Sequence, residues 1–215
     1  MSIGMGETRW ISYQAARVRA SMKRSRSNWI RTKAWDWEFK HGKWDYLKAH
    51  GYDQFYELLV GRLSGGSLLD LGCGNGSVRC NLPEGAMRRY VGLDYSAEAI
   101  AQLEERVADR APLPDGQELL VGDMTDRELL QRSGGNFDVV LLHECLNYVE
   151  VPRVADYLRH LCSLMKPGGV VMIRIWERNR YADHVAAIRS ALHIIEETQS
   201  ETNPSIFVVA DGPLP

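Results

Sequence analysis

The sequence has few of the features that mark secreted, membrane-embedded or metal-binding proteins. Its four cysteines are far apart and form no Cys-x-x-Cys pair, so neither a disulfide framework nor a metal site is predicted. No apolar run approaches the roughly 20 residues that span a bilayer, and residues 1–10 contain no apolar stretch of the kind found in secretory signals. We therefore expect a cytoplasmic protein without a metal and without a membrane partner.

A large excess of one charge is also missing. The formal net charge is -2, which gives no attraction of the whole molecule to nucleic acid or to anionic lipid. The exception is a run from Arg17 to Lys33 that contains seven basic residues and no acidic one. Such a run serves either as a phosphate-binding arm or as a solvated helix face, and the solvated face is the more common of the two. Nucleic acid is therefore not the expected partner.

Residues 1–63 differ in composition from the rest of the chain. They contain five of the six tryptophans, and we predict that they form a helical, aromatic-rich cap on a domain that spans residues 64–215. The rings of this cap either stack on a ligand or form the cap's own core. The rings in question are Trp29, Trp35, Trp37, Trp44, Tyr46 and Tyr52.

After residue 64, short apolar segments alternate with helical patterns, which is typical of an α/β sheet that is mainly parallel and covered by helices on both faces. The expected strands are 68–71, 90–93, 118–121, 137–142 and 170–176. Strand 137–142 is the most apolar and should be central. Two further strands, 192–195 and 205–209, have no helix between them and must pair antiparallel. The sheet is therefore mixed, with a hairpin at one edge.

The most informative stretch is the sequence LLDLGCGNGSV at positions 68–78. It predicts a buried strand that runs into a turn with glycine at positions 72, 74 and 76, which lets the backbone approach a ligand closely. No Gly-Lys-Ser/Thr follows, so the turn is not a P-loop. Ser77 stands where the third glycine of a Gly-x-Gly-x-x-Gly dinucleotide fingerprint is expected. The acidic Asp70 just before the turn predicts a ligand that carries positive charge.

Carboxylates follow three of the predicted strands, at Asp70, Asp94 and Asp123. A single aspartate in such a place is commonly a turn residue. Because ligands of wound parallel sheets bind outside the carboxyl ends of the strands, three carboxylates at those ends are expected to converge on one crevice.

Four motifs in this order resemble those of the class I S-adenosylmethionine-dependent methyltransferases: LDLGCGNG, VGLDYS, VGDM and LMKPGG. The resemblance runs from about residue 66 to the end of the chain. It implies a Rossmann-like, seven-stranded mixed sheet of order 3-2-1-4-5-7-6, and S-adenosylmethionine as the cofactor. Within this class, the chain is similar to small bacterial methyltransferases that modify sugars and natural products.

The resemblance also implies roles for individual residues. Asp70 and the turn made of Gly72, Cys73 and Gly74 would face the methionyl ammonium group, with the His143 carbonyl as a further partner. Asp94 would accept the two ribose hydroxyls, because a carboxylate has two accepting oxygens. Asp123 would accept the adenine amino group, and Tyr95 and Met124 would pack against the adenine ring. Relatives commonly carry an Arg-Tyr pair where this chain has Phe55-Tyr56, so the anchor of the cofactor carboxylate stays open, with Lys43 as one candidate.

The catalytic candidates follow the central strand. His143 and Glu144 are candidate bases for removing a proton from a hydroxyl acceptor, and Tyr148 is a candidate substrate contact. The alternative for each is a structural role, since polar residues at strand ends often cap the next helix. The sequence HECL here differs from the Asp/Asn-Pro-Pro-Tyr/Phe and Pro-Cys motifs of nucleic-acid methyltransferases.

We therefore expect methyl transfer to an oxygen or nitrogen of a small molecule, a sugar or secondary metabolite, by a monomer or homodimer. Two alternatives stay open. One is an RNA-directed methyltransferase that uses the basic run. The other is a non-catalytic, cofactor-binding partner subunit.

Overall fold

The computed structural model describes residues 18, 21–23, 25, 27–46, 53–199 and 204–214. The strands are β1 (Ser67–Leu71), β2 (Arg89–Asp94), β3 (Gln117–Val121), β4 (Phe137–His143), β5 (Met165–Ile175), β6 (Leu192–Gln199) and β7 (Ile206–Pro213). The helices that lie wholly within the described ranges are α2 (Asn28–Lys40), α3 (Gln54–Leu63), α4 (Ser77–Asn81), α5 (Ala97–Val107), α6 (Arg127–Arg132), α7 (Val151–Cys162) and α8 (Ala182–Ala191), with a 3-10 turn η2 (Leu146–Tyr148).

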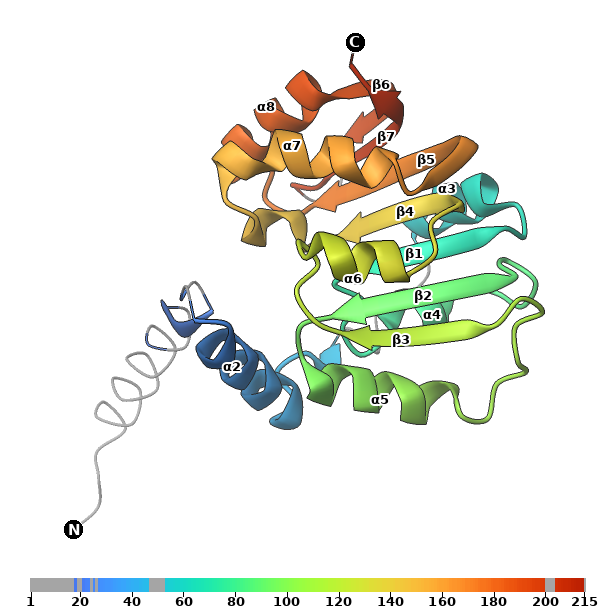
Figure 1. The fold of residues 1–215 in the computed structure, drawn as a ribbon, viewed down its shortest axis with the longest axis vertical. Coiled ribbons are helices and arrows are strands. Elements are labelled where there is room, and N and C mark those ends of the chain that lie inside the picture. Colours follow the sequence, from blue (N-terminus) through green and yellow to red (C-terminus); the bar gives the residue numbers. More distant parts are fainter. Residues whose placement is uncertain are drawn as a thin grey trace.

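The strands form one sheet of order β3-β2-β1-β4-β5-β7-β6 (Figure 1). The first five strands are parallel, and β7 runs antiparallel to both of its neighbours. The predicted order and the predicted terminal hairpin are both confirmed. Strand β4 occupies the centre, and the four side chains of its segment 139–142 are completely buried, which explains why it is the most apolar run of the chain.

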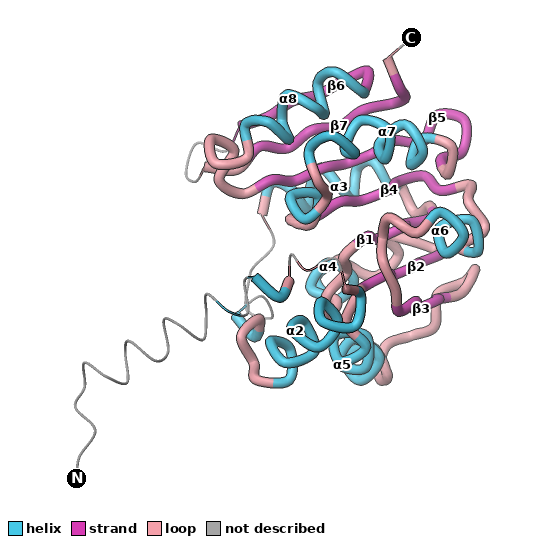
Figure 2. The backbone as a smooth tube through the Cα atoms, turned by 60° about the vertical axis from the view of Figure 1, so that its left-hand side comes forward, coloured by secondary structure: helices cyan, strands magenta, loops and turns pink. Residues whose placement is uncertain are grey.

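Helices cover both faces of the sheet. Leu130 of α6, Leu158 of α7 and Ile188 of α8 belong to one apolar core. A second core on the opposite face includes Phe55 of α3 and Leu103 of α5. Figures 1 and 2 show the sheet between these two helical layers. Two buried cores explain why the central strands are apolar on both faces instead of alternating.

Local capping sets where several helices begin. Ser96 is the kind of residue that the sequence predicts at a helix start, and its hydroxyl accepts the Ala99 amide at 3.2 Å and caps α5. Thr125 and Asp126 are both candidate caps by sequence, and it is Asp126 that accepts the Glu128 and Leu129 amides and caps α6. These caps anchor helix ends at the edge of the sheet where the strands end.

The end of α7 differs from the prediction. The Pro-Gly-Gly segment after Lys166 predicts a helix that runs to Met165, but α7 ends three residues earlier, at Cys162. The Ser163 and Leu164 amides close the last turn on the carbonyls of His160 and Leu161. The Pro-Gly segment instead lies within β5, at a register shift between β4 and β5.

The described part of the N-terminal region lies beyond the carboxyl ends of the strands, where α2 is seen in Figure 1. Asp36 of α2 accepts the Ser96 hydroxyl at 2.7 Å, and the Phe39 carbonyl accepts the Gln102 side chain at 3.1 Å. Helix α2 is thereby attached to α5 over the ends of β1 and β2. The predicted division of the chain at residue 63 stays a prediction, and Tyr52 lies outside the described residues. Within the described ranges, no helix combines the length and the apolar character that a membrane crossing needs.

Candidate functional site

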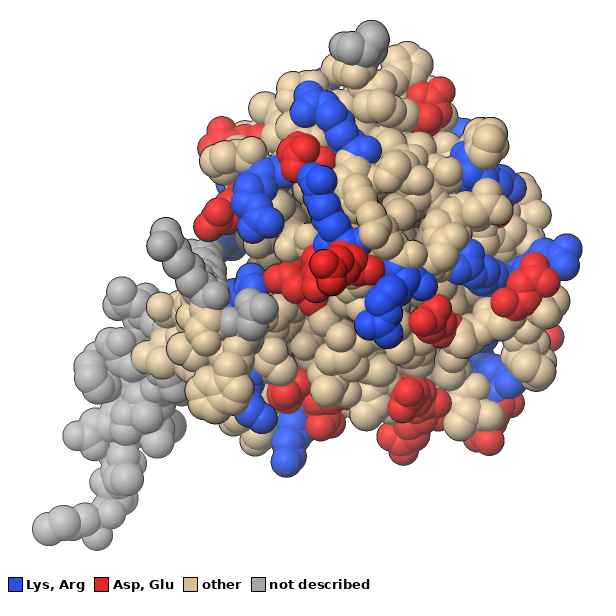
Figure 3. Space-filling view, viewed as in Figure 1, with Lys and Arg blue, Asp and Glu red and all other residues tan. Residues whose placement is uncertain are grey.

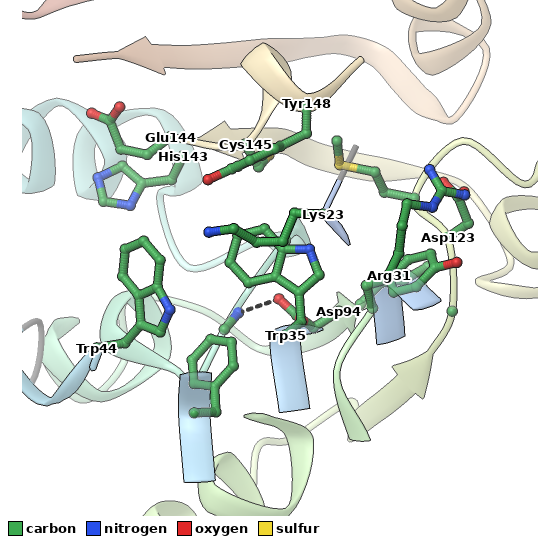
Figure 4. Close-up of a pocket in the computed structure, with 17 residues that line it drawn as sticks. Lys23, Arg31, Trp35, Trp44, Asp94, Asp123, His143, Glu144, Cys145 and Tyr148 are labelled. Atoms are coloured by element: carbon green, nitrogen blue, oxygen red, sulfur yellow. Dashed lines mark hydrogen bonds and ion pairs between the residues drawn. The ribbon is translucent and has the colours of Figure 1, made fainter. Parts of the chain in front are cut away.

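Two adjoining cavities open at the carboxyl ends of the parallel strands. The smaller, of about 160 Å³, lies between α2 and the ends of β2 and β3. The larger, of about 690 Å³, lies over the ends of β1, β4 and β5. Apart from Lys43, the residues predicted to bind the cofactor or to take part in catalysis line one or both of them: Asp70, Gly72, Cys73, Gly74, Asp94, Tyr95, Asp123, Met124, His143, Glu144 and Tyr148. Figure 4 shows the smaller cavity.

The glycine turn after β1 forms the floor shared by the two cavities. Gly72 and Gly74 have φ angles of 67° and 54°, in the left-handed region that favours glycine. A Cβ atom at position 72 would lie 2.7 Å from the Cβ atom of Cys145. The Gly72 and Cys73 amides both donate to the Leu93 carbonyl, which ties the turn to β2. A side chain at position 72 is therefore excluded both by backbone conformation and by space.

Asp94 is fixed at the end of β2 by backbone amides. One carboxylate oxygen accepts the Gly74 amide at 2.8 Å (Figure 4). The other accepts the Ser96 amide at 2.9 Å. Burial raises the pKa of Asp94 to about 6, although these amides act in the opposite direction. A carboxylate has about four lone-pair sites, so Asp94 keeps accepting capacity for a ligand that carries neighbouring hydroxyls.

Asp70 is a completely buried carboxylate at the end of β1. One oxygen accepts the Tyr90 hydroxyl at 2.9 Å, and the other has no hydrogen-bond partner among the described residues. Burial raises the pKa of Asp70 to about 7, and the nearby Asp94 contributes in the same direction. A buried acid without a counter-charge is costly, and a cationic group in the larger cavity would satisfy it. The site therefore fits an ammonium-bearing ligand.

Asp123 stands beside the smaller cavity and contacts a residue that the sequence did not single out. One of its oxygens accepts the amide and hydroxyl of Thr125, at 2.9 and 2.8 Å. The other lies 2.9 Å from the Arg31 guanidinium, which is 4.9 Å from the centre of the Tyr95 ring. Arg31 of α2 thus contacts Asp123 and Tyr95, the two side chains that the family resemblance assigns to the adenine group.

The basic run is not simply a solvated helix face. Lys33 is exposed, but Arg31 and Lys23 both line the smaller cavity. Lys23 lies 4.3 Å from the centre of the Trp35 ring and 3.0 Å from Glu38. Other members of the run, including Arg17, lie outside the described residues.

Glu38 is a fully buried acid at which several side chains of the N-terminal region meet. It accepts hydrogen bonds from Lys23, Lys43 and the Trp44 indole at 2.8–3.1 Å. Burial alone would raise its pKa, but the two lysines hold the pKa below its usual range. Lys43, the candidate anchor for a cofactor carboxylate, therefore pairs with Glu38, and it lines neither of the two cavities.

The aromatic residues of the N-terminal region divide into two groups. Trp35 and Trp44 have ring centres 5.9 Å apart and line the smaller cavity. Trp29 and Trp37 are 69% and 40% exposed, so they face away from it. Tyr148, at the end of η2, meets Trp35 edge to face at 5.0 Å and lines both cavities.

The corner between β4 and β5 contains a functional candidate that sequence reasoning missed. Arg174 is only 8% exposed and lies beside His143 in the β4–β5 register. Its guanidinium contacts Asp53, His143 and Glu144 at 3.1–3.3 Å, and it lines the larger cavity. The sequence does contain a signal for Arg174, because it is the single charged residue in the otherwise apolar segment VVMIRIW. In a strand of a sheet that helices cover on both faces, a charged side chain is not expected to face solvent.

Glu144 adopts a left-handed backbone conformation, with φ at 62°. Its carboxylate accepts the Trp176 amide at 2.6 Å, and its own amide donates to the Arg174 carbonyl at 3.1 Å. Burial raises the pKa of Glu144 above its usual value. Non-glycine residues held in this conformation cost energy and cluster at functional sites, which favours a role for Glu144 at the cavity it lines.

The cysteines of the site do not resemble nucleophiles. Cys73 and Cys145 are buried, and burial raises the pKa of both thiols well above the usual value. Cys145 donates from Sγ to the Leu71 carbonyl at 3.0 Å, which is a packing role. Among the described residues, no group of three or more His, Cys, Asp or Glu side chains has an arrangement that would hold a metal ion.

Known proteins match this chain in both sequence and fold. A family model described as "Methyltransferase domain" matches residues 33–201. The ubiquinone biosynthesis O-methyltransferase of Ralstonia nicotianae is 33% identical over 126 residues, which is 59% of this chain and 50% of that protein. The protein of the same name from Sodalis glossinidius is 33% identical over 146 residues, which is 67% of this chain and 55% of that protein. The chain thus spans about half the length of the curated relatives it matches.

Solved structures agree on the fold. A TehB-like SAM-dependent methyltransferase from Corynebacterium glutamicum aligns with a TM-score of 0.60 at 20% identity, over 81% of this chain and 97% of that one. The magnesium protoporphyrin IX methyltransferase of Synechocystis, solved with bound SAM, aligns with a TM-score of 0.62 at 17% identity, over 85% and 95%. The family model covers well over half of the chain, and the sheet order is the one expected from the motifs. The chain therefore belongs to the methyltransferase-domain family.

Proposed function

We propose that this chain binds S-adenosylmethionine and transfers its methyl group to an oxygen of a small-molecule acceptor. The observation that carries the proposal is the meeting of Asp70, Asp94 and Asp123 around the glycine turn, at one end of the sheet. Membership of the methyltransferase-domain family supports the reaction type. The curated relatives are named O-methyltransferases, which favours oxygen over nitrogen as the acceptor atom.

The three carboxylates match three different parts of such a cofactor. Asp70, which is buried without a counter-charge, would hold the ammonium group. Asp94 would accept the ribose hydroxyls with the lone pairs that the Gly74 and Ser96 amides leave. Asp123 would accept the adenine amino group, with Tyr95 and Met124 against the ring. The bound cofactor supplies an electrophilic methyl group on a sulfonium.

Arg31 gives this assignment a consequence for binding. Its guanidinium pairs with the Asp123 oxygen that an adenine amino group would share, and it lies over Tyr95. Cofactor binding therefore requires Arg31 to share Asp123 or to move aside together with its part of α2.

The acceptor would occupy the larger cavity, next to the ammonium position. Its lining combines aromatic rings with polar groups, which suits a compact molecule with ring and hydroxyl surfaces, such as a sugar or secondary metabolite. A hydroxyl acceptor must lose its proton, and His143 and Glu144 are the candidate groups that line both cavities. Tyr148 lines both cavities as well and would contact the acceptor.

Two other functions were considered from the sequence. For an RNA-directed enzyme, a broad basic surface is expected, whereas Lys, Arg, Asp and Glu are interspersed on the face shown in Figure 3. For a non-catalytic subunit, a partner chain is needed. One neighbour in fold, a putative methyltransferase from Haloferax volcanii, was solved in complex with the Trm112 methyltransferase activator, with a TM-score of 0.62 at 18% identity over 84% of this chain and 98% of that one.

Labelled transfer tests these functions together. The purified chain is incubated with methyl-labelled S-adenosylmethionine in three separate reactions. One contains a small-molecule extract, one contains total RNA, and one contains no acceptor. The proposal expects a labelled small product that a hydroxyl-blocking reagent abolishes. Label in RNA would establish the RNA-directed function instead. Cofactor binding without transfer to any acceptor would favour the partner-subunit function.

A further inference from the structure

Arg174 is a buried cation that is given no role in the cofactor and acceptor sites proposed above. It lies where β4, β5 and the beginning of α3 meet, and Asp53, which caps α3, accepts from its Nη1 atom at 3.1 Å. The rings of Phe55 and Phe207 lie 5.5 and 5.1 Å from the guanidinium carbon. These contacts hold the guanidinium in one place at the edge of the larger cavity.

The contact between Arg174 and His143 determines where the imidazole proton is. The Nη1 atom of Arg174 lies 3.3 Å from Nε2 of His143. A guanidinium has only donors, so this contact is a hydrogen bond only if Nε2 supplies a lone pair. The neutral ring must then carry its proton on Nδ1. The other neutral tautomer, with the proton on Nε2, would place two N–H donors against each other and lose this hydrogen bond. The doubly protonated ring would in addition place two cations at the same distance, which Coulomb repulsion opposes.

The plane of the His143 ring is also fixed. The Phe55 ring stacks on it with centroids 4.8 Å apart and an interplanar angle of 23°. On the other side of the same arginine, Nε lies 3.1 Å from an oxygen of Glu144. Each Glu144 oxygen has a second lone pair beyond the contacts described above, so Glu144 is still able to accept a proton. One guanidinium thus contacts both candidate bases, but it occupies the basic nitrogen of only one of them.

We propose that Arg174 is a positioning residue that holds His143 as the Nδ1–H tautomer, with its basic nitrogen occupied, and so leaves Glu144 to receive the proton of the acceptor. In that transfer the acceptor O–H bond breaks, the proton binds a Glu144 oxygen, and the electron pair stays on the acceptor oxygen. The role of Glu144 rests on the proposed function, whereas the tautomer of His143 does not.

Nitrogen NMR of the histidine rings tests the tautomer directly. Long-range ¹H–¹⁵N spectra are recorded at pH 7.5 for the full chain and for Arg174→Met and Arg174→Lys, and the His143 signals are assigned from their loss in His143→Gln. Arg189→Met, which removes an exposed ion pair with Glu197, is the control for loss of an arginine. We expect the wild type and Arg189→Met to show a protonated Nδ1 and a lone pair on Nε2 of His143. Arg174→Met should shift the ring towards the Nε2–H tautomer, and Arg174→Lys should retain part of the wild-type pattern.

A protonated Nε2 in the wild type would overturn the proposal, and so would an unchanged tautomer in a folded Arg174→Met. Because the wild-type spectrum already decides the tautomer, the proposal stays testable if a variant does not fold. Binding of S-adenosylhomocysteine is measured on the same wild-type sample. If the wild type shows the expected tautomer but does not bind S-adenosylhomocysteine, the proposed function is refuted and the tautomer assignment is not. If it binds S-adenosylhomocysteine but shows the other tautomer, the tautomer assignment is refuted and the proposed function is not.

Discussion

Replacing Asp70 by asparagine is expected to stabilise the ligand-free protein at alkaline pH. An exposed aspartate has a pKa of 3.8, and burial raises that of Asp70 to about 7. Because the folded-state pKa is the higher one, folding disfavours the ionised form. The stability of the wild type therefore falls as pH rises from about 4 to about 7. At about 1.4 kcal/mol per pH unit, full ionisation of this group costs about 4 kcal/mol.

Asparagine has no charge to bury and keeps an acceptor for the Tyr90 hydroxyl, which lies 2.9 Å from Asp70. Its amide replaces the carboxylate oxygen that has no partner among the described residues, so a penalty that does not depend on pH partly offsets the gain. The informative quantity is therefore the change with pH. Linkage predicts that the free energy of unfolding of Asp70→Asn, relative to wild type, rises by about 2–3 kcal/mol between pH 5 and pH 8.

Urea unfolding followed by tryptophan fluorescence at both pH values measures this difference. Asp109→Asn, at an exposed position after α5, is the matched control and should show no such change. If the difference between Asp70→Asn and wild type is the same at pH 5 and pH 8, Asp70 is not a buried acid without a counter-charge, and the reasoning fails. The same variant should bind S-adenosylmethionine more weakly, since the carboxylate proposed to face the ammonium group is gone.

Two further substitutions test the glycine turn and the N-terminal region. Gly72→Ala should lower the free energy of unfolding by about 2–3 kcal/mol, because its Cβ would meet Cys145 at 2.7 Å. Gly116→Ala, also at positive φ but with nothing within 4 Å, should lose only about 1 kcal/mol in the same urea titration; equal losses would show that space at position 72 is not limiting. Glu38→Gln should cost about 3 kcal/mol in thermal unfolding, because two lysines lose a buried partner, and a loss below about 1 kcal/mol would contradict that contact.

The sheet was predictable from the sequence because its signals are local. Apolar runs, glycine turns and caps such as Ser96 each act within a few residues, and the order of the strands followed from the resemblance of the motifs. The end of α7 was misplaced because the helix closes on its own carbonyls at Cys162, before the Pro-Gly signal is reached. Proline and glycine exclude a helix without determining which earlier residue ends it.

Only those residues of the site that lie at strand ends were predictable from the sequence. Asp70, Asp94 and Asp123 lie at the strand ends of a sheet whose topology was known, so their convergence followed. Arg31 and Arg174 join the site through contacts with residues 92 and 31 positions away, and no local pattern encodes such pairs. Lys43 was considered as an anchor although it pairs with Glu38, which is close in sequence; what the sequence did not indicate is that Glu38 is buried.

Calorimetric titration with S-adenosylhomocysteine is the most direct test of the cofactor site. The wild type and Asp126→Ala, which changes only a helix cap away from both cavities, should bind one equivalent with the same affinity. Asp94→Ala should bind at least about 100-fold more weakly, since two hydrogen bonds to a charged group are lost at about 1.5 kcal/mol or more each. Unchanged affinity in a folded Asp94→Ala, or no binding by the wild type, would contradict the account.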